Sequence, residues 1–293
     1  MTTITSPTVA AHSTSAQAGR KLSAAEMAAY ERDGFYVARG LFKPEEVALI
    51  REAFMAAGAN GPVPGLSETH YKDFATYDPS DPLARYPRML HPHRHPELPI
   101  GPLAQKYMLD ARVGAILADL MGDEPIAAQS MYYFKPAGAR GQALHQDNVY
   151  LQVKPGTCMA AWTAIDDADE ENGGLVVVPG SHKLDLKCPE RNANRQESFT
   201  DDLVKVPAGM QELPVRLQAG DVLFFNGMVI HGSYPNRSKD RFRGSLICHY
   251  LPRGAAEISH YYKPLLDFAG QVVERAVATG GGPCGTAEAK GPH

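Results

Sequence analysis

Short apolar segments separated by turn-forming residues fill the sequence between residues 126 and 252. The segments are rich in apolar, β-branched and aromatic residues, and glycine, proline, asparagine and aspartate stand between them, as expected for strands joined by tight turns. Many short strands at this spacing predict a β-sandwich or a jelly-roll barrel. Helical segments precede the strands without alternating with them, which disfavours a doubly wound α/β sheet. The expected strands are residues 127–134, 143–151, 159–165, 175–178, 213–217, 222–225 and 244–251.

Helical signals flank this strand-rich region, so the expected fold class is mainly β with flanking helices. Ser23 and Glu26 have the spacing of a capping box, and Pro44 followed by two glutamates marks the start of a second helix. A third segment has apolar residues at a helical period and ends at Gly122. Leucine, phenylalanine and valine residues near the C-terminus indicate a fourth helix packed on the barrel. The expected helices are residues 24–33, 44–57, 101–121 and 259–277.

The two ends of the chain differ from this core in composition. Residues 1–20 are rich in threonine, serine and alanine and lack a basic start followed by an apolar run, so we expect a disordered tail and no targeting peptide. A glycine-rich stretch near the C-terminus predicts a flexible tail at residues 279–293. Residues 21–278 are therefore expected to form a single domain with its jelly-roll core at about residues 126–252.

Two long polar segments are candidates for substrate binding. Residues 58–98 are dense in proline, glycine, histidine and tyrosine, and a loop of that length is usually functional or disordered. Residues 184–212 interrupt the strands and could form a lid or an ordinary surface excursion. Within the first segment His91, His93 and His95 alternate along the chain, which is compatible with a metal or substrate site, although a solvated loop is the simpler interpretation.

Composition excludes several classes of partner. The formal net charge is −4, and no block of lysine and arginine indicates nucleic-acid binding. No apolar window is long enough to span a bilayer, so we expect no membrane segment. The four cysteines are widely spaced and lack a Cys-x-x-Cys pair, so we expect reduced thiols in a cytoplasmic protein.

Three residues have the chemistry of a metal site. Side chains alternate along a strand, so His145 and Asp147 are expected to point the same way, and His231 on a later strand could complete the set. Two imidazoles and one carboxylate form the facial triad of non-heme Fe(II) oxygenases, which leaves positions open for co-substrate and oxygen. A second His-x-acid match, at residues 95–97, has proline at its centre and is typical of a loop. The simpler alternative is that these histidines and acids do not belong to one site.

Several motifs in this order resemble the phytanoyl-CoA dioxygenase family. That family comprises Fe(II)- and 2-oxoglutarate-dependent hydroxylases with a double-stranded β-helix, or cupin-like jelly-roll, fold, and the likeness covers about residues 24–252. The resemblance implies that His145, Asp147 and His231 bind Fe(II), and that 2-oxoglutarate and O2 are co-substrates. The motifs are Leu144-His145-Gln146-Asp147, Ala161-Trp162-Thr163-Ala164, the segment Asn172-Gly173-Gly174 to Pro179-Gly180-Ser181-His182, and His231-Gly232-Ser233.

The resemblance also implies which residues bind 2-oxoglutarate. In such families an arginine on a late strand binds its far carboxylate, and the spacing of Phe-Arg to a Cys-His-aromatic ending selects Arg243 over Arg237, Arg241 and Arg253. A guanidinium binds a carboxylate through two parallel hydrogen bonds. Ser245, two residues on, shares its face of a strand. Further positions that match co-substrate contacts of the family are Trp162, Met131 and Arg88. Simple packing is equally compatible with Trp162, and it is the more usual role of a strand methionine such as Met131.

The expected reaction is hydroxylation of an unactivated C–H bond, with release of succinate and CO2. Asp147 favours hydroxylation over halogenation, because related halogenases replace this carboxylate with a small residue. The same iron centre could instead catalyse desaturation, epoxidation or cyclisation. The chain could also be a catalytically silent jelly-roll binding protein or a Zn or Mn cupin without co-substrate. No large basic patch for a CoA tail stands out, so we expect a small-molecule metabolite as substrate instead of an acyl-CoA.

Overall fold

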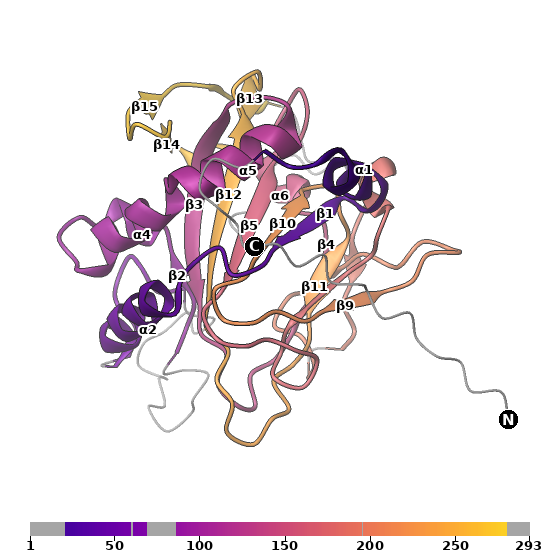
Figure 1. Ribbon diagram of the computed structural model, residues 1–293. Coiled ribbons are helices and arrows are strands. Elements are labelled where there is room, and N and C mark those ends of the chain that lie inside the picture. Colours follow the sequence, from indigo (N-terminus) through magenta and orange to yellow (C-terminus); the bar gives the residue numbers. More distant parts are fainter. Residues whose placement is uncertain (1–20, 60, 69–85, 195, 280–293) are drawn as a thin grey trace, which may run out of the picture.

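The computed structural model describes residues 21–59, 61–68, 86–194 and 196–279, which build a jelly-roll core with helices against one side (Figure 1). The expected tails lie outside the described residues, except for residue 279, and so does the part of the expected loop at residues 69–85. No helix in the described part of the chain is both long enough and apolar enough to cross a membrane.

Two antiparallel sheets form the jelly roll, as the strand pattern predicted. The larger sheet has the order β1-β10-β5-β12-β3-β14-β15, with β2 also paired to β3, and the smaller sheet has the order β4-β11-β6-β9. The strands of the larger sheet are β1 (Phe35–Ala38), β2 (Met89–Leu90), β3 (Pro125–Tyr133), β5 (Met159–Ala164), β10 (Val222–Asn226), β12 (Ser245–Pro252), β14 (Leu265–Leu266) and β15 (Val272–Val273). Those of the smaller sheet are β4 (Gln142–His145), β6 (Leu175–Val177), β9 (Leu213–Val215) and β11 (His231–Ser233).

The larger sheet is buried on both faces, because its side chains alternate between two hydrophobic clusters. One cluster joins the outer face of the sheet to the helices, and the other fills the space between the two sheets. Consecutive residues of a strand therefore pack into different clusters. The outward and inward pairs are Tyr132 and Met131 on β3, Ala161 and Trp162 on β5, Phe224 and Phe225 on β10, and Leu246 and Ile247 on β12.

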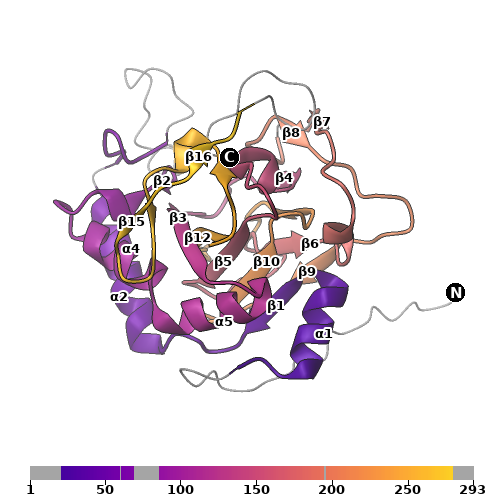
Figure 2. The same ribbon diagram turned by 90° about the horizontal axis from the view of Figure 1, so that it is seen from above.

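Among the described residues, four α-helices precede the core in the sequence: α1 (Ala24–Asp33), α2 (Pro44–Gly58), α4 (Ile100–Met108) and α5 (Ala111–Met121). Figure 2 shows α2, α4 and α5 on the outer side of the larger sheet, away from β4 and β6. Phe54 of α2 stacks on Tyr132 of β3, with ring centroids 4.0 Å apart and 4° between the planes. The predicted capping box of α1 is confirmed, because the Ser23 side chain accepts from Glu26 N and the Glu26 side chain accepts from Ser23 N.

The expected single helix at residues 101–121 is wrong, because the chain makes two helices there. α4 ends at Met108, and Asp110 begins α5 by accepting a hydrogen bond from Arg112 N at 2.9 Å. Aspartate is a strong N-cap residue. The apolar period continued across the break and concealed this stop signal.

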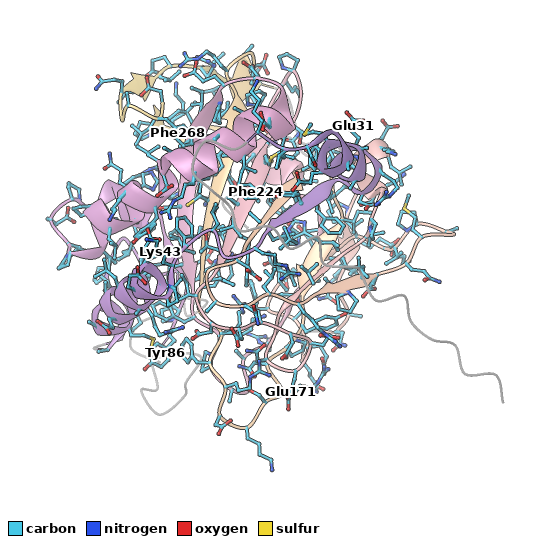
Figure 3. All side chains as sticks on the ribbon, in the orientation of Figure 1. Glu31, Lys43, Tyr86, Glu171, Phe224 and Phe268 are labelled. Atoms are coloured by element: carbon cyan, nitrogen blue, oxygen red, sulfur yellow. The ribbon has the colours of Figure 1, made fainter. Side chains whose placement is uncertain are left out.

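The expected C-terminal helix at residues 259–277 is also wrong. The chain there forms a short turn and small strands, because Pro264 cannot donate to a helix and Gly270 has a φ of +79°. The segment still packs on the protein: Phe268 lies beside α5 (Figure 3), where a Cβ on Gly114 would come within 2.7 Å of its ring. The elements are β13 (Glu257–Ile258), η4 (His260–Tyr262), β14, β15 and β16 (Ala276–Val277).

The insertion at residues 184–212 lies along the edge of β4 in the smaller sheet. It follows η3 (Ser181–Lys183) and contains β7 (Glu190–Arg191) and β8 (Asp202–Leu203). Val204 N donates to Leu144 O at 2.7 Å. The insertion therefore pairs with the strand that leads into the predicted metal motif, and its action as a lid stays a prediction.

The cysteines differ from the expectation of reduced thiols. Cys188, in the insertion, is disulfide-bonded, whereas Cys158 and Cys248 are free and buried. Cys284 lies outside the described residues. Spacing alone did not indicate a bond at Cys188, because no short cysteine motif contains it.

Candidate active site

Two histidines lie side by side because of the register between adjacent strands. His145 is the last residue of β4 and His231 is the first residue of β11. The strands are antiparallel neighbours in which these two residues are paired, and their ring centroids are 4.2 Å apart. Strand pairing therefore brings together two imidazoles that are far apart in the sequence.

Asp147 joins the histidines through a turn, not through the strand alternation that we expected. β4 ends at His145, and Asp147 has helical backbone angles (φ −60°, ψ −36°) at the start of α6 (Asn148–Leu151). The expected strand at residues 143–151 is thus wrong after residue 145. The turn still directs the carboxylate to the imidazoles, because Oδ1 of Asp147 lies 3.4 Å from Nε2 of His145 and 3.5 Å from Nε2 of His231.

Backbone carbonyls set the tautomers of both histidines. Nδ1 of His145 lies 2.9 Å from Ala143 O, and Nδ1 of His231 lies 3.0 Å from Val229 O. A carbonyl only accepts, so Nδ1 of each ring is the donor, and Nε2 is the nitrogen that each ring can offer to a metal. The three side chains are buried, and their ligand atoms lie within 4.8 Å of one another. Two neutral imidazole nitrogens and a carboxylate oxygen at this spacing fit a divalent transition metal.

His249 on β12 supports the carboxylate of Asp147 from behind. Its Nε2 lies 3.1 Å from Oδ2 of Asp147, and both side chains are 1% exposed. Oδ1 is left toward the two histidines, so this contact orients the carboxylate. In the sequence, His249 stands in the Cys-His-aromatic motif, which indicates no role for it. Strand alternation could have indicated its role, because His249 and Ser245 lie on the same face of β12.

Gln146, between two of the candidate ligands, connects the site to distant backbone. Its Nε2 donates to Met228 O at 2.7 Å, and its Oε1 accepts from Lys187 N at 2.7 Å. Met228 lies just before the strand that carries His231, and Lys187 belongs to the insertion. One buried side chain therefore joins the insertion to both ligand-bearing segments.

The candidate ligands open into a pocket with an empty volume of about 400 Å³. Met131 and Trp162, both predicted as co-substrate contacts, form part of its wall, and Arg243 lies in the same wall. Met131 comes from β3, Trp162 from β5, and Arg243 lies just before β12. The larger sheet thus presents three predicted co-substrate residues to the side on which the candidate metal ligands converge.

Arg243 is a buried cation that forms no ion pair among the described residues, although the charge of Asp166 acts on it from a longer distance. One guanidinium nitrogen, Nη1, donates to Ser245 Oγ, while Nε has no hydrogen-bond partner in the described structure. The guanidinium carbon lies 5.3 Å from the centre of the Trp162 ring. Burial lowers the pKa of Arg243 to about 10. A carboxylate in the pocket would supply both the opposite charge and the missing acceptors. Ser245 holds the guanidinium and is not itself part of the pocket wall described here.

The other three candidate arginines have ordinary partners near the surface. Arg241 pairs with Asp169 at 2.8 Å, and Arg253 pairs with Glu124 at 2.5 Å. Arg237 forms an ion pair with an exposed glutamate. Among the four arginines, the structure therefore places Arg243 alone in the pocket.

Ser233 lies in the pocket wall two residues after His231, and the sequence analysis gave it no role. Its Oγ accepts from the Gln142 backbone N–H at 3.1 Å and from Lys135 Nζ at 2.9 Å. Strand alternation from His231 was the available signal, because residues two apart on a strand share a face.

Arg88 reaches the pocket only through another residue. Its guanidinium forms an ion pair with Glu68 and donates to Tyr133 Oη at 2.5 Å. Tyr133 lines the pocket. The predicted direct contact between Arg88 and a co-substrate stays a prediction, and the structure places Arg88 where it orients the Tyr133 hydroxyl.

The three alternating histidines do not meet at one point. His93, in η2 (Pro92–Arg94), shares a hydrogen bond of 2.6 Å between Nδ1 and Ser130 Oγ, and His95 pairs with Glu97 at 3.0 Å. Burial lowers the pKa of His91 to about 2 and that of His93 to about 3. In the described part of the chain, ligand atoms at metal-binding spacing are found in His145, Asp147 and His231 and not in this group.

Comparison with known proteins decides the family. The phytanoyl-CoA dioxygenase (PhyH) family model matches residues 30–245, most of the chain. The chain belongs to this family. The resemblance inferred from the motifs is thereby confirmed.

Relatives within and around this family support the assignment. Phytanoyl-CoA dioxygenase 1 of Oryza sativa subsp. japonica is 35% identical over 142 residues, which cover 47% of this chain and 50% of the rice protein. The chain thus spans about half the length of the first curated relatives that it matches. The peroxisomal phytanoyl-CoA dioxygenase of Rattus norvegicus is 26% identical over 264 residues, 84% of this chain and 73% of the rat protein.

A solved structure shares the fold. The epimerase SnoN from nogalamycin biosynthesis, in complex with Fe3+, alpha ketoglutarate and nogalamycin RO, superimposes with a TM-score of 0.61. The two chains are 22% identical over 79% of this chain and 84% of SnoN. The predicted cupin-like jelly roll is confirmed by this likeness and by the two-sheet topology.

Proposed function

We propose that this protein is an Fe(II)- and 2-oxoglutarate-dependent dioxygenase that hydroxylates a C–H bond of a small-molecule metabolite. The observation that carries the proposal is the joint presence, in one pocket, of a His-Asp-His ligand set and a buried arginine whose Nε has no hydrogen-bond partner in the described structure. Membership of the phytanoyl-CoA dioxygenase family supports it. A silent binding protein or a Zn or Mn cupin would have no use for Arg243 in this place.

The roles of the residues follow from their positions. His145, Asp147 and His231 would hold the metal, and His249 would keep Asp147 oriented. Iron in this site would supply a centre that takes the 2-oxo acid end of the co-substrate and O2, coupling decarboxylation to oxidation of the substrate. Arg243 would bind the far carboxylate, with Trp162 and Met131 as walls. The buried setting strengthens these charge contacts because little water screens them.

A small metabolite suits the charges of the site better than an acyl-CoA. Arg243 is the one lysine or arginine in the described pocket wall, and it is committed to the co-substrate. A CoA tail would need further cations for its phosphates. The loop at residues 59–98 and the insertion at residues 184–212 are the segments proposed to contact substrate.

A cytoplasmic location also stays a prediction. It depended in part on reduced cysteines, and the disulfide at Cys188 removes that support. Fractionation of the native organism with an antibody to the chain would decide the location.

The central test measures succinate. Protein loaded with Fe(II) should convert 2-oxoglutarate to succinate, and a panel of metabolites should be screened for those that stimulate this turnover. Product masses separate the outcomes, since hydroxylation adds one oxygen and desaturation removes two hydrogens. Alanine at His145 or His231 should abolish both iron binding in calorimetry and succinate formation, whereas His260→Ala, at an exposed position outside the pocket, should retain both. Iron-loaded protein that never consumes 2-oxoglutarate with any substrate would refute the proposal.

A further inference from the structure

Lys135 is a buried lysine for which the chemistry above gives no role. It is 3% exposed, and the one charge in the described structure that acts on its ammonium is the like charge of Arg243. Burial, followed by that nearby charge, lowers the pKa of Lys135 well below the usual value. Gly173 makes room for the side chain, because a Cβ there would overlap Lys135 Cδ. An uncompensated lysine is costly to bury, which points to a purpose beyond packing.

Lys135 contacts Ser233 and Arg243, two residues of the pocket with donors suited to a carboxylate. Its Nζ donates to Ser233 Oγ at 2.9 Å and to Tyr234 O at 2.7 Å. Its backbone carbonyl accepts from Arg243 N at 3.0 Å. Lys135 therefore contacts both Arg243 and Ser233, which line the pocket. Lys135 itself is not among the residues of the pocket wall.

These contacts restrict what the Ser233 hydroxyl can do. A hydroxyl oxygen has two acceptor positions and one proton to donate. Lys135 Nζ and Gln142 N occupy both acceptor positions of Ser233, at 2.9 and 3.1 Å. The hydroxyl is then left as a donor only. Because Ser233 lines the pocket, that donor suits a carboxylate, which only accepts.

We infer that Lys135 is a positioning residue for 2-oxoglutarate: it holds Ser233 as an obligatory donor to the co-substrate's far carboxylate, beside Arg243. The inference rests on the proposed function, since it assumes that 2-oxoglutarate enters this pocket. Lys135 does not touch the co-substrate, so its effect passes through Ser233. Its action should depend on the far carboxylate and not on the 2-oxo acid end.

The test uses Lys135→Met, which removes the donor, keeps the length of the side chain and leaves the backbone bond to Arg243 in place. Binding can be followed in anaerobic, Fe(II)-loaded protein by the fluorescence of Trp162, the one tryptophan of the chain, which lies beside Arg243. We expect Lys135→Met to weaken 2-oxoglutarate binding about 10- to 100-fold, as for the loss of a hydrogen bond to a charged group. Pyruvate has the 2-oxo acid end but no far carboxylate. The affinity of Lys135→Met for pyruvate should therefore lie within about twofold of the wild-type affinity for pyruvate.

A double-mutant cycle separates positioning from a general structural role. If Lys135 acts through Ser233, Lys135→Met should add nothing to the loss already caused by Ser233→Ala. Additive losses, equal losses for pyruvate, or unchanged 2-oxoglutarate affinity in Lys135→Met would each overturn the inference. If Lys135→Met does not fold, Lys135→Gln, which keeps a shorter donor, should show a smaller loss that again disappears in the Ser233→Ala background. Wild-type protein that binds no 2-oxoglutarate would overturn the proposed function as well, whereas wild-type binding with an unaffected variant would remove this inference alone.

Discussion

Replacing Arg243 by methionine should stabilise the protein while destroying its affinity for 2-oxoglutarate. The guanidinium is almost fully buried, and burial lowers its pKa from the ordinary arginine value to about 10. The folded state therefore disfavours the charged form relative to the unfolded state. Methionine has similar length and no charge to bury.

The magnitude follows from the pKa. A decrease of the pKa from the ordinary arginine value to about 10 corresponds to a penalty of about 3 kcal/mol at neutral pH, where the arginine is charged in both states. Methionine loses the hydrogen bond to Ser245 and some packing, which together offset about 1–2 kcal/mol. The net gain should be about 1–2 kcal/mol, or roughly 2–6 °C in the midpoint of thermal unfolding. The penalty applies below the folded-state pKa and would fade only as the pH rises past about 10.

The assay compares thermal unfolding with and without 2-oxoglutarate. The variant should unfold at a higher temperature than wild type without ligand and should gain nothing from added 2-oxoglutarate. Wild type should be stabilised by it through mass action. Arg241→Met is the matched control, because Arg241 is partly exposed and paired with Asp169. That variant should keep the response to 2-oxoglutarate and show no gain in stability.

Two results would refute this reasoning. An Arg243→Met protein that is less stable than wild type would mean that the charge is compensated in the folded protein without a ligand. A variant that keeps wild-type affinity for 2-oxoglutarate would mean that the far carboxylate binds elsewhere.

Three further predictions concern the surroundings of the site. His249→Phe removes the contact to Asp147 Oδ2 and should lower iron affinity about 10- to 100-fold in calorimetry, with unfolding temperature as the control. Gln146→Ala should expose Lys187 in the insertion to faster amide exchange, and unchanged exchange would contradict the proposed connection. His91 and His93 stay neutral when folded, so the unfolded state takes up more protons than the folded state below pH 6.5. The free energy of unfolding should therefore decrease toward pH 3 by up to about 1.4 kcal/mol per pH unit per histidine. Urea unfolding of a variant with glutamine at both positions should show a shallower pH dependence.

The jelly roll could be predicted from short stretches of sequence, because each buried strand needs a run of apolar residues and each turn needs turn-forming residues. The C-terminal segment misled the same reasoning, since its leucines and valines matched a helical period while Pro264 and Gly270 excluded a helix. At the site, residue type identified His145, Asp147 and His231, but the geometry of Asp147 depends on a turn that periodicity does not reveal.

The supporting residues were harder to predict than the candidate ligands. Lys135 and His249 have their roles because of what the fold places around them, namely Ser233 and Asp147, which are distant in the sequence. A buried charged group without an ion pair in the described structure, such as Arg243, can be recognised only when the burial of its surroundings is known. Sequence motifs therefore indicated the chemistry, and packing indicated which residues hold it in place.

The bond from Gln146 to the insertion ends on a main-chain amide, that of Lys187. Such a connection is indifferent to the side chain at position 187, and only proline, which lacks the N–H, would cut it. Substitutions of Lys187 by residues other than proline should therefore leave the insertion attached to the segment that carries the candidate metal ligands.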